Sequence, residues 1–564
     1  MRIFSPSVVG RLAFAVLVIS GTNAGSAQSP TSNDSQYLTF QIFSAGPGMT
    51  TEPGKHVFSQ LPNPTFFEDE ARQLLDAIGE RGDERHRLGI MVGPLTLDHT
   101  DVQLRTLVQR TFAVASKYKI AVGLHIDDSK FWMNRRDLWA DHANVEWLDW
   151  SGTPNTGQYL DWGGGPWKLA PQACLNSPAM VKEARRVAGS VIGPAIAEGL
   201  ANLRSTGDEA LFAGVIVGWE TQLGRDFDTG RDLGYCALTN LGFNANSPPS
   251  DIDGALESVV QNWIETWSSS LVDAGVPSDR IYSHIAFVPK FDDPHRSGSG
   301  SYARSVLYTP PQVAFGETHR AGFSTYPDGD RFRQIYEAVT SHGNPHWASS
   351  EGANVDISIS PYTIPEQTME NYLARMFNHG ATLTNVFGWD IGDSAFVFRR
   401  AAENPAAIEA YRKFLRGESL DESPLDQSTS REVSRLRSFV NTLPDRIQSY
   451  IRAGGEMVAI QPKLNEFDRD VKAGHFDATK RDIDQIEATI EAQVTKAGAG
   501  FDVVAALREK MQTLPQQIAA FQQHNGDINR IKARVESIQK HITAGEPAKA
   551  FDEIQELEPI LESP

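Results

Sequence analysis

The sequence predicts an α/β fold, a (β/α)8 barrel, followed by an all-α domain made of two tandem helical repeats. Two observations support this prediction. Between residues 36 and 415, short apolar runs that suit buried parallel strands alternate with amphipathic helical patterns. After residue 430 every tryptophan disappears, the pattern becomes helical, and the chain matches itself at an offset of 71 residues.

The first 27 residues have the features of a signal peptide. Arg2 and Arg11 supply positive charge, residues 12–19 form a short apolar core, and small residues precede Gln28. The core is far shorter than the roughly 20 residues that a membrane span requires. We therefore expect an exported protein, periplasmic or secreted, with no membrane span.

The charge balance excludes one class of partner. The chain carries 71 acidic and 52 basic residues, a formal net charge of −19. Such a chain repels a phosphate backbone, so we expect no nucleic-acid partner.

The two cysteines, Cys174 and Cys236, lie on the connections that flank the fourth predicted strand. Export would allow them to form a disulfide that braces these connections. Two buried, unpaired thiols fit the sequence equally well, and the sequence does not decide between these alternatives.

Each predicted strand is a short apolar run bounded by polar segments. They cover residues 36–46, 87–97, 120–127, 212–220, 280–288, 321–326, 346–352 and 382–390. Helical apolar stripes follow most of them, at residues 66–80, 104–115, 180–200, 255–275, 331–343 and 369–380. Among the seven crossovers between consecutive strands, only the fifth lacks a convincing helix. Right-handed crossovers close eight such units into a TIM barrel, the domain that we assign to residues 36–415.

The fourth strand ends in an unusual way. Its apolar run, residues 212–217, suits burial, yet it leads directly into Trp219 and Glu220. The C-terminal ends of barrel strands are where such folds place their chemistry. Glu351 takes the corresponding place on the seventh strand, Tyr326 on the sixth and Trp389 on the eighth.

In these positions the chain resembles the clan A retaining glycoside hydrolases, which have a (β/α)8 barrel with an acid/base Glu after strand four and a nucleophile Glu after strand seven. The resemblance covers the barrel, about two thirds of the chain, and rests on strand order. It implies that Glu220 is the acid/base, that Glu351 is the nucleophile and that Tyr326 hydrogen-bonds Glu351. One residue departs from the pattern: Trp219 stands where the family commonly has Asn, so the usual hydrogen bond to a substrate 2-hydroxyl comes from elsewhere or is absent.

The chemistry of retention agrees with this pair. It needs a protonated carboxyl for the leaving oxygen and an ionised carboxylate, roughly 5 to 5.5 Å away, for the anomeric carbon. Glu220 and Glu351, three strands apart, can point across the barrel mouth at that separation. The Trp219 ring would supply apolar surroundings that favour a protonated carboxyl. For either Glu alone, a structural salt bridge is the alternative.

Other candidate substrate-binding residues lie at strand ends and in a long loop, residues 130–177, that holds six of the eleven tryptophans. Indole faces pack on sugar rings, whereas the alternative is that these rings form the loop's own small core. The candidates are His125, Asp127, Asp128, Trp132, Trp219, His284, Tyr326, Trp389 and Asp390.

The sequence therefore predicts an exported retaining glycoside hydrolase that acts on a carbohydrate, with no cofactor and no resident metal. Two other functions stay open. One is a barrel that binds glycans without cutting them. The other is a metal-dependent hydrolase built on His125, Asp127 and Asp128. The sugar, its linkage and the choice between exo and endo action are not specified.

The C-terminal prediction rests on self-similarity. Residues 416–430 read as a polar linker and residues 431–564 as the helical repeat domain, in two units of about three helices at 434–492 and 505–561. Its expected role is non-catalytic: a spacer, an oligomerisation surface, a dock for a cell-envelope partner, or a stabilising appendage. The residues that match at the offset of 71 include Leu436 and Leu507, Leu443 and Leu514, Ile460 and Ile531, and Ile483 and Ile554.

Overall fold

A computed structural model describes most of the barrel and part of the C-terminal region. The described residues are 35–45, 59–160, 167–286, 309–326, 331–354, 368–387, 405–423, 446–472, 476–498 and 528–543, with single positions between 439 and 561. The predicted signal peptide lies outside them, as do Trp389 and Asp390.

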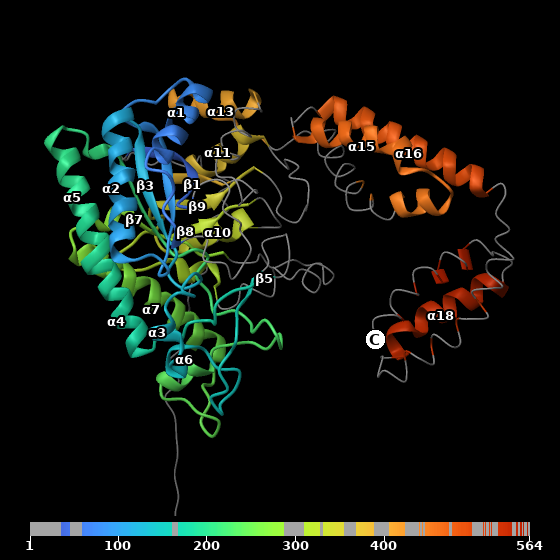
Figure 1. The fold of residues 1–564 in the computed structure, drawn as a ribbon, viewed down its shortest axis with the longest axis horizontal. Coiled ribbons are helices and arrows are strands. Elements are labelled where there is room, and N and C mark those ends of the chain that lie inside the picture. The colour runs from blue at the N-terminus through green and yellow to red at the C-terminus, as the bar shows by residue number, and fades with distance from the viewer. Residues whose placement is uncertain are drawn as a thin grey trace, which may run out of the picture.

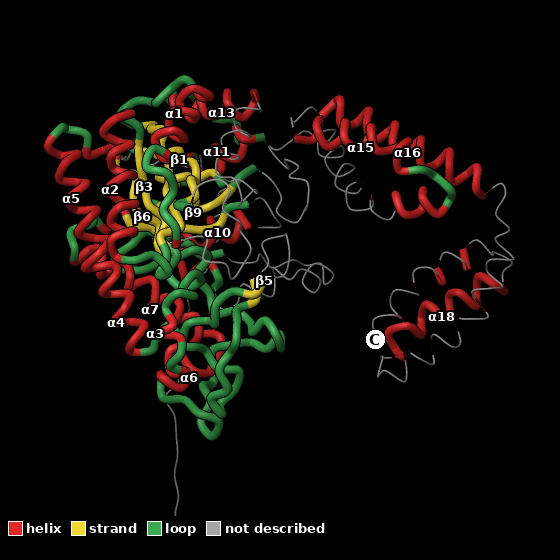
Figure 2. The backbone as a smooth tube through the Cα atoms, viewed as in Figure 1, coloured by secondary structure: helices red, strands yellow, loops and turns green. Residues whose placement is uncertain are grey.

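Eight parallel strands form the centre of the protein (Figures 1 and 2). Their order around the sheet is β7-β6-β3-β2-β1-β10-β9-β8. Isolated parallel bridges between Tyr282 and Arg320 and between Ile285 and Phe323 bring β7 beside β8, so the barrel is nearly closed. The predicted eight-stranded parallel barrel is thus confirmed. The strands are β1 (Gln36–Phe43), β2 (His86–Leu95), β3 (Ala121–Ile126), β6 (Phe212–Val217), β7 (Ile281–Ser283), β8 (Gly322–Ser324), β9 (Trp347–Gly352) and β10 (Ala381–Val386).

Helices surround the strands (Figure 2). Local signals mark where several begin: Thr100 and Gln103 form a capping box at α2, and Ser177 caps α4 with Pro178 in the first turn. The tryptophans Trp263 and Trp267, four residues apart on α7, are both buried. The helices are α1 (Phe66–Ile78), α2 (Asp101–Tyr118), α4 (Pro178–Val187), α5 (Gly193–Ser205), α7 (Ile252–Asp273), α10 (Arg331–Ser341), α11 (Met369–Phe377) and α13 (Pro405–Leu415).

Shorter turns of helix join these elements. A π-turn, Ala188–Ile192, connects α4 to α5, and the 3-10 turns are His142–Asn144, Glu209–Leu211, Ser278–Arg280 and Pro311–Ala314. The segment after β7, where the sequence predicts no helix, falls mostly in residues 287–308, outside the described part of the chain.

The barrel interior has an apolar end and a polar end. Tyr37, Met91, Ala121, Ala213, Ile216, Tyr282, Ala348 and Leu383 form the apolar cluster. Because side chains of a strand alternate between its two faces, Thr39 and Gln41 follow Tyr37 into the interior, and His125 follows Ala121. All three polar side chains are completely buried. The polar end is therefore the C-terminal end of the strands.

Long connections gather at that end (Figure 2). The one after β3 contains α3 (Arg136–Trp139), β4 (Tyr159–Leu160) and β5 (Trp167–Lys168), and the one after β6 contains α6 (Tyr235–Asn240). A bridge between Gln158 and Asp226 joins the two connections. They form one structured layer beside the strand ends.

Residues 416–423, which the sequence assigns to the linker, contact the barrel. Leu420 joins the main core, and Glu422 pairs with His379 at 2.8 Å. The Asn371 side-chain amide also donates to the Ser423 carbonyl oxygen at 2.8 Å. The chain therefore stays attached to α11 until at least residue 423.

The described C-terminal helices lie apart from the barrel (Figure 1): α15 (Met457–Lys472), α16 (Phe476–Gly498) and α18 (Ile528–Thr543). Helix α18 begins 71 residues after α15 begins and ends 71 residues after α15 ends. Two separate apolar clusters lie here, and seven of the eight buried residues of the first have a counterpart 71 positions later in the second. The pairs are Leu443 and Leu514, Tyr450 and Phe521, Ile460 and Ile531, Phe467 and Ile538, Ile483 and Ile554, Ile486 and Leu557, and Ile490 and Leu561.

No helix in the described part of the chain is both long enough and apolar enough to cross a membrane.

Candidate active site

Glu220 lies three residues beyond β6, in a turn whose backbone is strained. Its φ angle is +59°, a left-handed conformation that is uncommon outside glycine. Gly218 in the same turn has φ +98°, and a Cβ there would lie 2.3 Å from Thr221 Oγ1. The turn directs a buried Glu220 side chain, 4% exposed, toward the barrel axis.

Residues after β3 hold this turn in place. The Lys130 ammonium donates hydrogen bonds to the carbonyl oxygens of Trp219 and Glu220. Asp128 accepts from the Thr221 hydroxyl at 2.7 Å. Asp127 accepts a hydrogen bond from the backbone N–H of Lys130 at 2.9 Å, and this bond fixes the backbone of the lysine. Contacts from the residues that follow β3 therefore hold Glu220 in its strained conformation.

His125, Asp127 and Asp128 lie at the end of β3, beside the turn that carries Glu220, and their role in substrate binding stays a prediction. They are buried, and His125, Asp128 and Asp127 Oδ1 contact protein groups, whereas Asp127 Oδ2 is buried without a hydrogen-bond partner among the described residues. Burial raises the pKa of Asp127 to about 7 and lowers the pKa of His125 to about 3. These residues support the turn that carries Glu220.

Glu351 is the next-to-last residue of β9 and approaches Glu220 across the interior. The Tyr326 hydroxyl donates to Glu351 Oε1 at 2.9 Å, the contact that the resemblance implies. One carboxylate oxygen of Glu220, one of Glu351 and a ring nitrogen of His284 all lie within 4.8 Å of one another. An oxygen-to-oxygen distance of at most 4.8 Å is compatible with the roughly 5 to 5.5 Å between the carboxyl groups of a retaining pair.

The electrostatics of the pair favour one shared proton. Burial and the Glu220 carboxylate raise the pKa of Glu351 well above its usual value, while the Tyr326 hydroxyl and the Lys130 ammonium act in the opposite direction. Burial lowers the pKa of Lys130, although four carboxylates oppose this effect. Two carboxyls this close do not both ionise readily. One acid and one carboxylate is therefore the expected state.

The residues at the end of β3 are not arranged as the proposed metal ligands of the alternative hydrolase would be. Within the described residues, Glu220, His284 and Glu351 are the only group of three such side chains whose potential ligand atoms come within 4.8 Å. Both ring nitrogens of His284 already have partners, His125 at 3.0 Å and the Ser324 hydroxyl at 3.0 Å. His125, Asp127 and Asp128 do not form such a group.

Two of the predicted substrate-binding tryptophans, Trp219 and Trp132, pack against other protein groups in this structure. The Trp219 ring packs on the His125 ring at 4.1 Å between centroids and touches Phe43 and Phe387. Trp132 is completely buried, and its indole N–H donates to the Pro171 carbonyl oxygen at 2.9 Å. In this structure the ring forms part of a core cluster, which is the alternative that the sequence leaves open, and its role as a sugar platform stays a prediction.

Three residues that contact this site were not among the predicted site residues. Lys130 follows the acidic pair Asp127 and Asp128 by two positions, Ser324 precedes Tyr326 by two positions, and Gln41 stands among apolar residues of β1. The signal that could have found Gln41 and Ser324 is a polar residue at an inward position of a buried strand.

Glu146 ties the two long connections together. It is completely buried, its Oε2 accepts from the backbone N–H of Cys236 at 3.1 Å, and the backbone N–H groups of Trp147 and Ala237 also bond to it. Burial raises its pKa to about 8. The carboxyl is therefore mostly protonated at neutral pH.

We expect Glu146→Gln to change the pH dependence of stability. Since the folded chain keeps a proton that the unfolded chain loses above its ordinary pKa of 4.5, wild-type stability falls as the pH rises from 4.5 to about 8. As the pH rises through this range, the free energy of unfolding of the variant minus that of wild type should increase by up to about 1.4 kcal/mol per pH unit. Urea unfolding between pH 5 and pH 8 measures this. Glu183→Gln, which removes a carboxylate with a lowered pKa, is the control; a constant difference for Glu146→Gln contradicts the prediction.

Both cysteines are buried thiols in this structure. The Asn240 side-chain amide contacts both sulfurs, at 3.3 Å for Cys174 and 3.9 Å for Cys236. Burial, the Cys236 thiol and Glu146 raise the pKa of Cys174. The thiols are thus neighbours between the two connections, and their oxidation to a disulfide stays a prediction.

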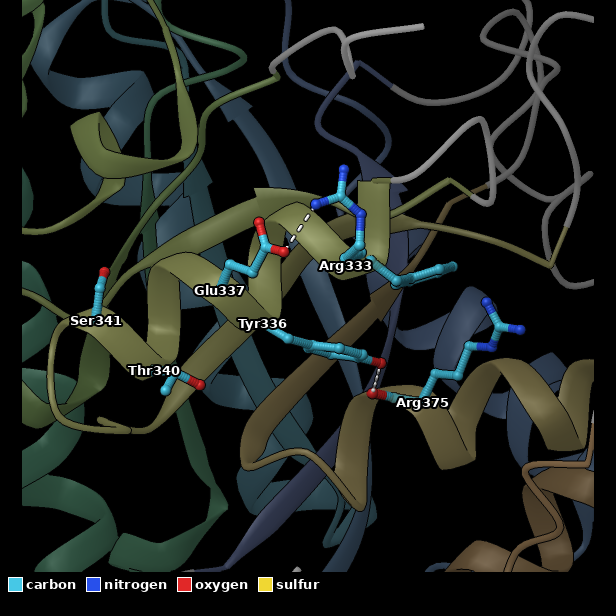
Figure 3. A pocket seen from close by; sticks show the side chains of 7 residues that line it. Arg333, Tyr336, Glu337, Thr340, Ser341 and Arg375 are labelled. Atoms are coloured by element: carbon cyan, nitrogen blue, oxygen red, sulfur yellow. Dashed lines mark hydrogen bonds and ion pairs between the residues drawn. The ribbon is translucent and has the colours of Figure 1, made fainter. Parts of the chain in front are cut away.

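A groove of about 650 Å³ lies on the outer surface between α10 and α11 (Figure 3). Tyr336 reaches across it to the Arg375 carbonyl oxygen at 2.8 Å, and Arg333 pairs with Glu337 at 2.7 Å. The groove is lined by helix residues and holds no pair of buried carboxyls. It is therefore a feature separate from the Glu220 and Glu351 site.

No protein-family model matches this chain, and a search of curated proteins also found no match. The site therefore has to be interpreted from its own geometry: two buried glutamates from the fourth and seventh strands of a parallel barrel, facing each other at the C-terminal ends of the strands.

Proposed function

We propose that this protein is an exported retaining glycoside hydrolase, with Glu220 as acid/base and Glu351 as nucleophile. The observation that carries the proposal is the approach of their carboxylate oxygens to within 4.8 Å at the polar end of the barrel. The hydrogen bond from Tyr326 supports it, because donation to Glu351 stabilises the ionised form that a nucleophile needs and opposes the burial and the Glu220 charge that raise its pKa.

The reaction would run in two steps. In the first, a Glu351 oxygen forms a bond to the anomeric carbon, the glycosidic C–O bond breaks, and Glu220 gives its proton to the leaving oxygen. In the second, Glu220 takes a proton from water, the water oxygen attacks the anomeric carbon, and the Glu351 ester bond breaks. Both carboxyls return to their starting states, and the sugar keeps its configuration.

The test is to screen the full chain against aryl glycosides of the common neutral and anionic sugars. For each substrate that is cleaved, proton NMR of the first product measures its anomeric configuration. Retention is expected. Inversion, or binding of a glycan without any turnover, contradicts the proposed mechanism.

The glycan-binding alternative relies on the tryptophan-rich loop, which serves a binding barrel and an enzyme equally. Burial of Trp132 weakens the loop as an open platform, whereas a binding protein has no need for two buried carboxyls in contact range. The enzyme therefore accounts for more of the site.

For residues 431–564 we propose two tandem helical units without a catalytic role. The shared spacing of 71 residues between α15 and α18, and between the two apolar clusters, supports this. A spacer, an oligomerisation surface or a dock for a cell-envelope partner fits such an exported appendage, and export itself rests on the first 27 residues.

A chain that ends after Ser430 should stay soluble and turn over substrate at the wild-type rate. The reason is that the described C-terminal helices, α15, α16 and α18, lie apart from the barrel that holds Glu220 and Glu351 (Figure 1). Size-exclusion chromatography and steady-state assays compare it with the full chain. Loss of turnover in a truncated protein whose circular dichroism shows a folded barrel would refute a non-catalytic role.

A further inference from the structure

The ammonium of Lys130 binds two consecutive carbonyl oxygens in the turn that carries Glu220. The acceptors are the oxygens of Trp219 and Glu220, and the lysine is only 1% exposed. An ammonium has three N–H donors, enough for both oxygens. Burial of a cation is costly unless hydrogen bonds or opposite charges compensate it. The lysine is therefore built into the turn and is not a surface cation.

Two consecutive carbonyl oxygens point toward one atom only in some backbone conformations. In a helical conformation neighbouring peptide dipoles are aligned, whereas in a strand they alternate. The φ and ψ angles of Glu220 set the angle between the Trp219 and Glu220 carbonyls. With φ at +59°, Glu220 has a left-handed helical conformation, in which both oxygens turn to the same side. The two bonds from Lys130 therefore fit this conformation and not an extended one.

The same conformation decides where the Glu220 side chain points. The left-handed region is unfavourable for a residue that has a Cβ, so contacts elsewhere must hold Glu220 there. A change to an extended conformation would rotate the Cα–Cβ bond about the chain. The carboxylate would then move away from Glu351, whose oxygen lies within 4.8 Å of it. The approach of the two carboxylates thus depends on the left-handed backbone.

Other contacts hold the residue after Glu220. The Thr221 N–H donates to the His284 carbonyl oxygen at 3.3 Å, and the Thr221 hydroxyl donates to Asp128 at 2.7 Å. These bonds anchor the end of the turn. The bonds from Lys130 fix the peptide that precedes Glu220 as well, so the backbone is held on both sides of its Cα.

We propose that Lys130 is a positioning residue for Glu220. By binding the carbonyl oxygens on both sides of the Glu220 Cα, its ammonium keeps the residue left-handed and its carboxyl directed toward Glu351. The inference rests on the proposed function, which it deepens, because Lys130 acts on the reaction only through Glu220.

Lys130→Met removes the ammonium and keeps a side chain of similar length. We expect kcat/KM to fall about a hundredfold for aryl glycosides with poor leaving groups, because a displaced Glu220 no longer reaches the leaving oxygen. The loss should be much smaller for activated leaving groups. Lys117→Met is the matched control: it changes an exposed lysine of α2 that pairs with Glu68, and its kinetics should follow wild type.

A double variant separates an action through Glu220 from a general loss of structure. In a Glu220→Gln background no acid is left to position, so adding Lys130→Met should cause little further loss of kcat/KM. Losses that multiply would show that Lys130 acts independently of Glu220, and would overturn the inference.

Loss of a buried cation can also unfold a chain. If Lys130→Met does not fold, the same measurements are made on Asp127→Asn/Lys130→Met, which removes one buried carboxyl together with the cation. Asp127→Asn alone is then the reference, and the same differences are expected.

The crystal structure of the folded variant tests the inference without any substrate. Glu220 should have a negative φ, and its carboxylate oxygens should lie farther than 4.8 Å from those of Glu351. A left-handed Glu220 that keeps its place would overturn the inference even in an active hydrolase. The expected change in a chain that cleaves no glycoside would support the role of Lys130 in the turn and reject the proposed function.

Discussion

Glu351→Gln should lower kcat/KM by at least about a thousandfold on any glycoside that wild type cleaves. The amide keeps the size of the side chain and its contact with Tyr326 but cannot form the covalent bond to the anomeric carbon. Steady-state assays with aryl glycosides measure the loss. Equal activity of variant and wild type would show that Glu351 is not the nucleophile.

Two further variants separate chemistry from folding. Glu337→Gln changes an exposed glutamate of α10 that pairs with Arg333, and should leave turnover unchanged. Glu351→Gly removes the carboxylate and opens a space in which added formate can act as the nucleophile. Turnover that returns with formate, with an inverted product, is expected only if the missing group attacked the anomeric carbon.

Glu220→Gln should cost about 10²- to 10⁴-fold for substrates with poor leaving groups, the usual range for a lost general acid. The loss should be much smaller for activated aryl leaving groups, which depart without a proton. A series of aryl glycosides of graded leaving-group pKa measures the dependence.

The control for this variant lies on the same connection. Asp232→Asn replaces an exposed carboxylate that pairs with Arg225, and its kinetics should follow wild type across the series. A Glu220→Gln loss that is the same for every leaving group would argue for a structural role in the strained turn and against acid catalysis.

These predictions depend on a scaffold that the sequence pattern already indicates. Apolar runs and helical stripes are local properties, so they predict the eight barrel strands and six of the flanking helical segments without knowledge of their neighbours, whereas α13 and the short elements of the long connections were not predicted. Boundaries were less certain: β7 and β8 are three residues each, shorter than the apolar runs that predict them, because strand ends depend on the partner strand.

The position of Glu220 and Glu351 also follows from the sequence, because strand order in a parallel barrel brings the carboxyl ends of all strands to one face. Their approach to within 4.8 Å does not, since it depends on the left-handed turn at Glu220 and on the Lys130 contacts that hold it.

Only the tertiary structure decided what the polar and aromatic residues near this pair do. Trp132, His125 and Asp128 have the composition of a sugar-binding site, yet all three are completely buried. Burial and hydrogen-bond partners arise where distant segments meet, as when β1, β3, β7 and β8 bring Gln41, His125, His284 and Ser324 into one chain of contacts. The local sequence carries hydrophobicity and spacing, whereas the partner of a buried polar atom is a property of the whole fold.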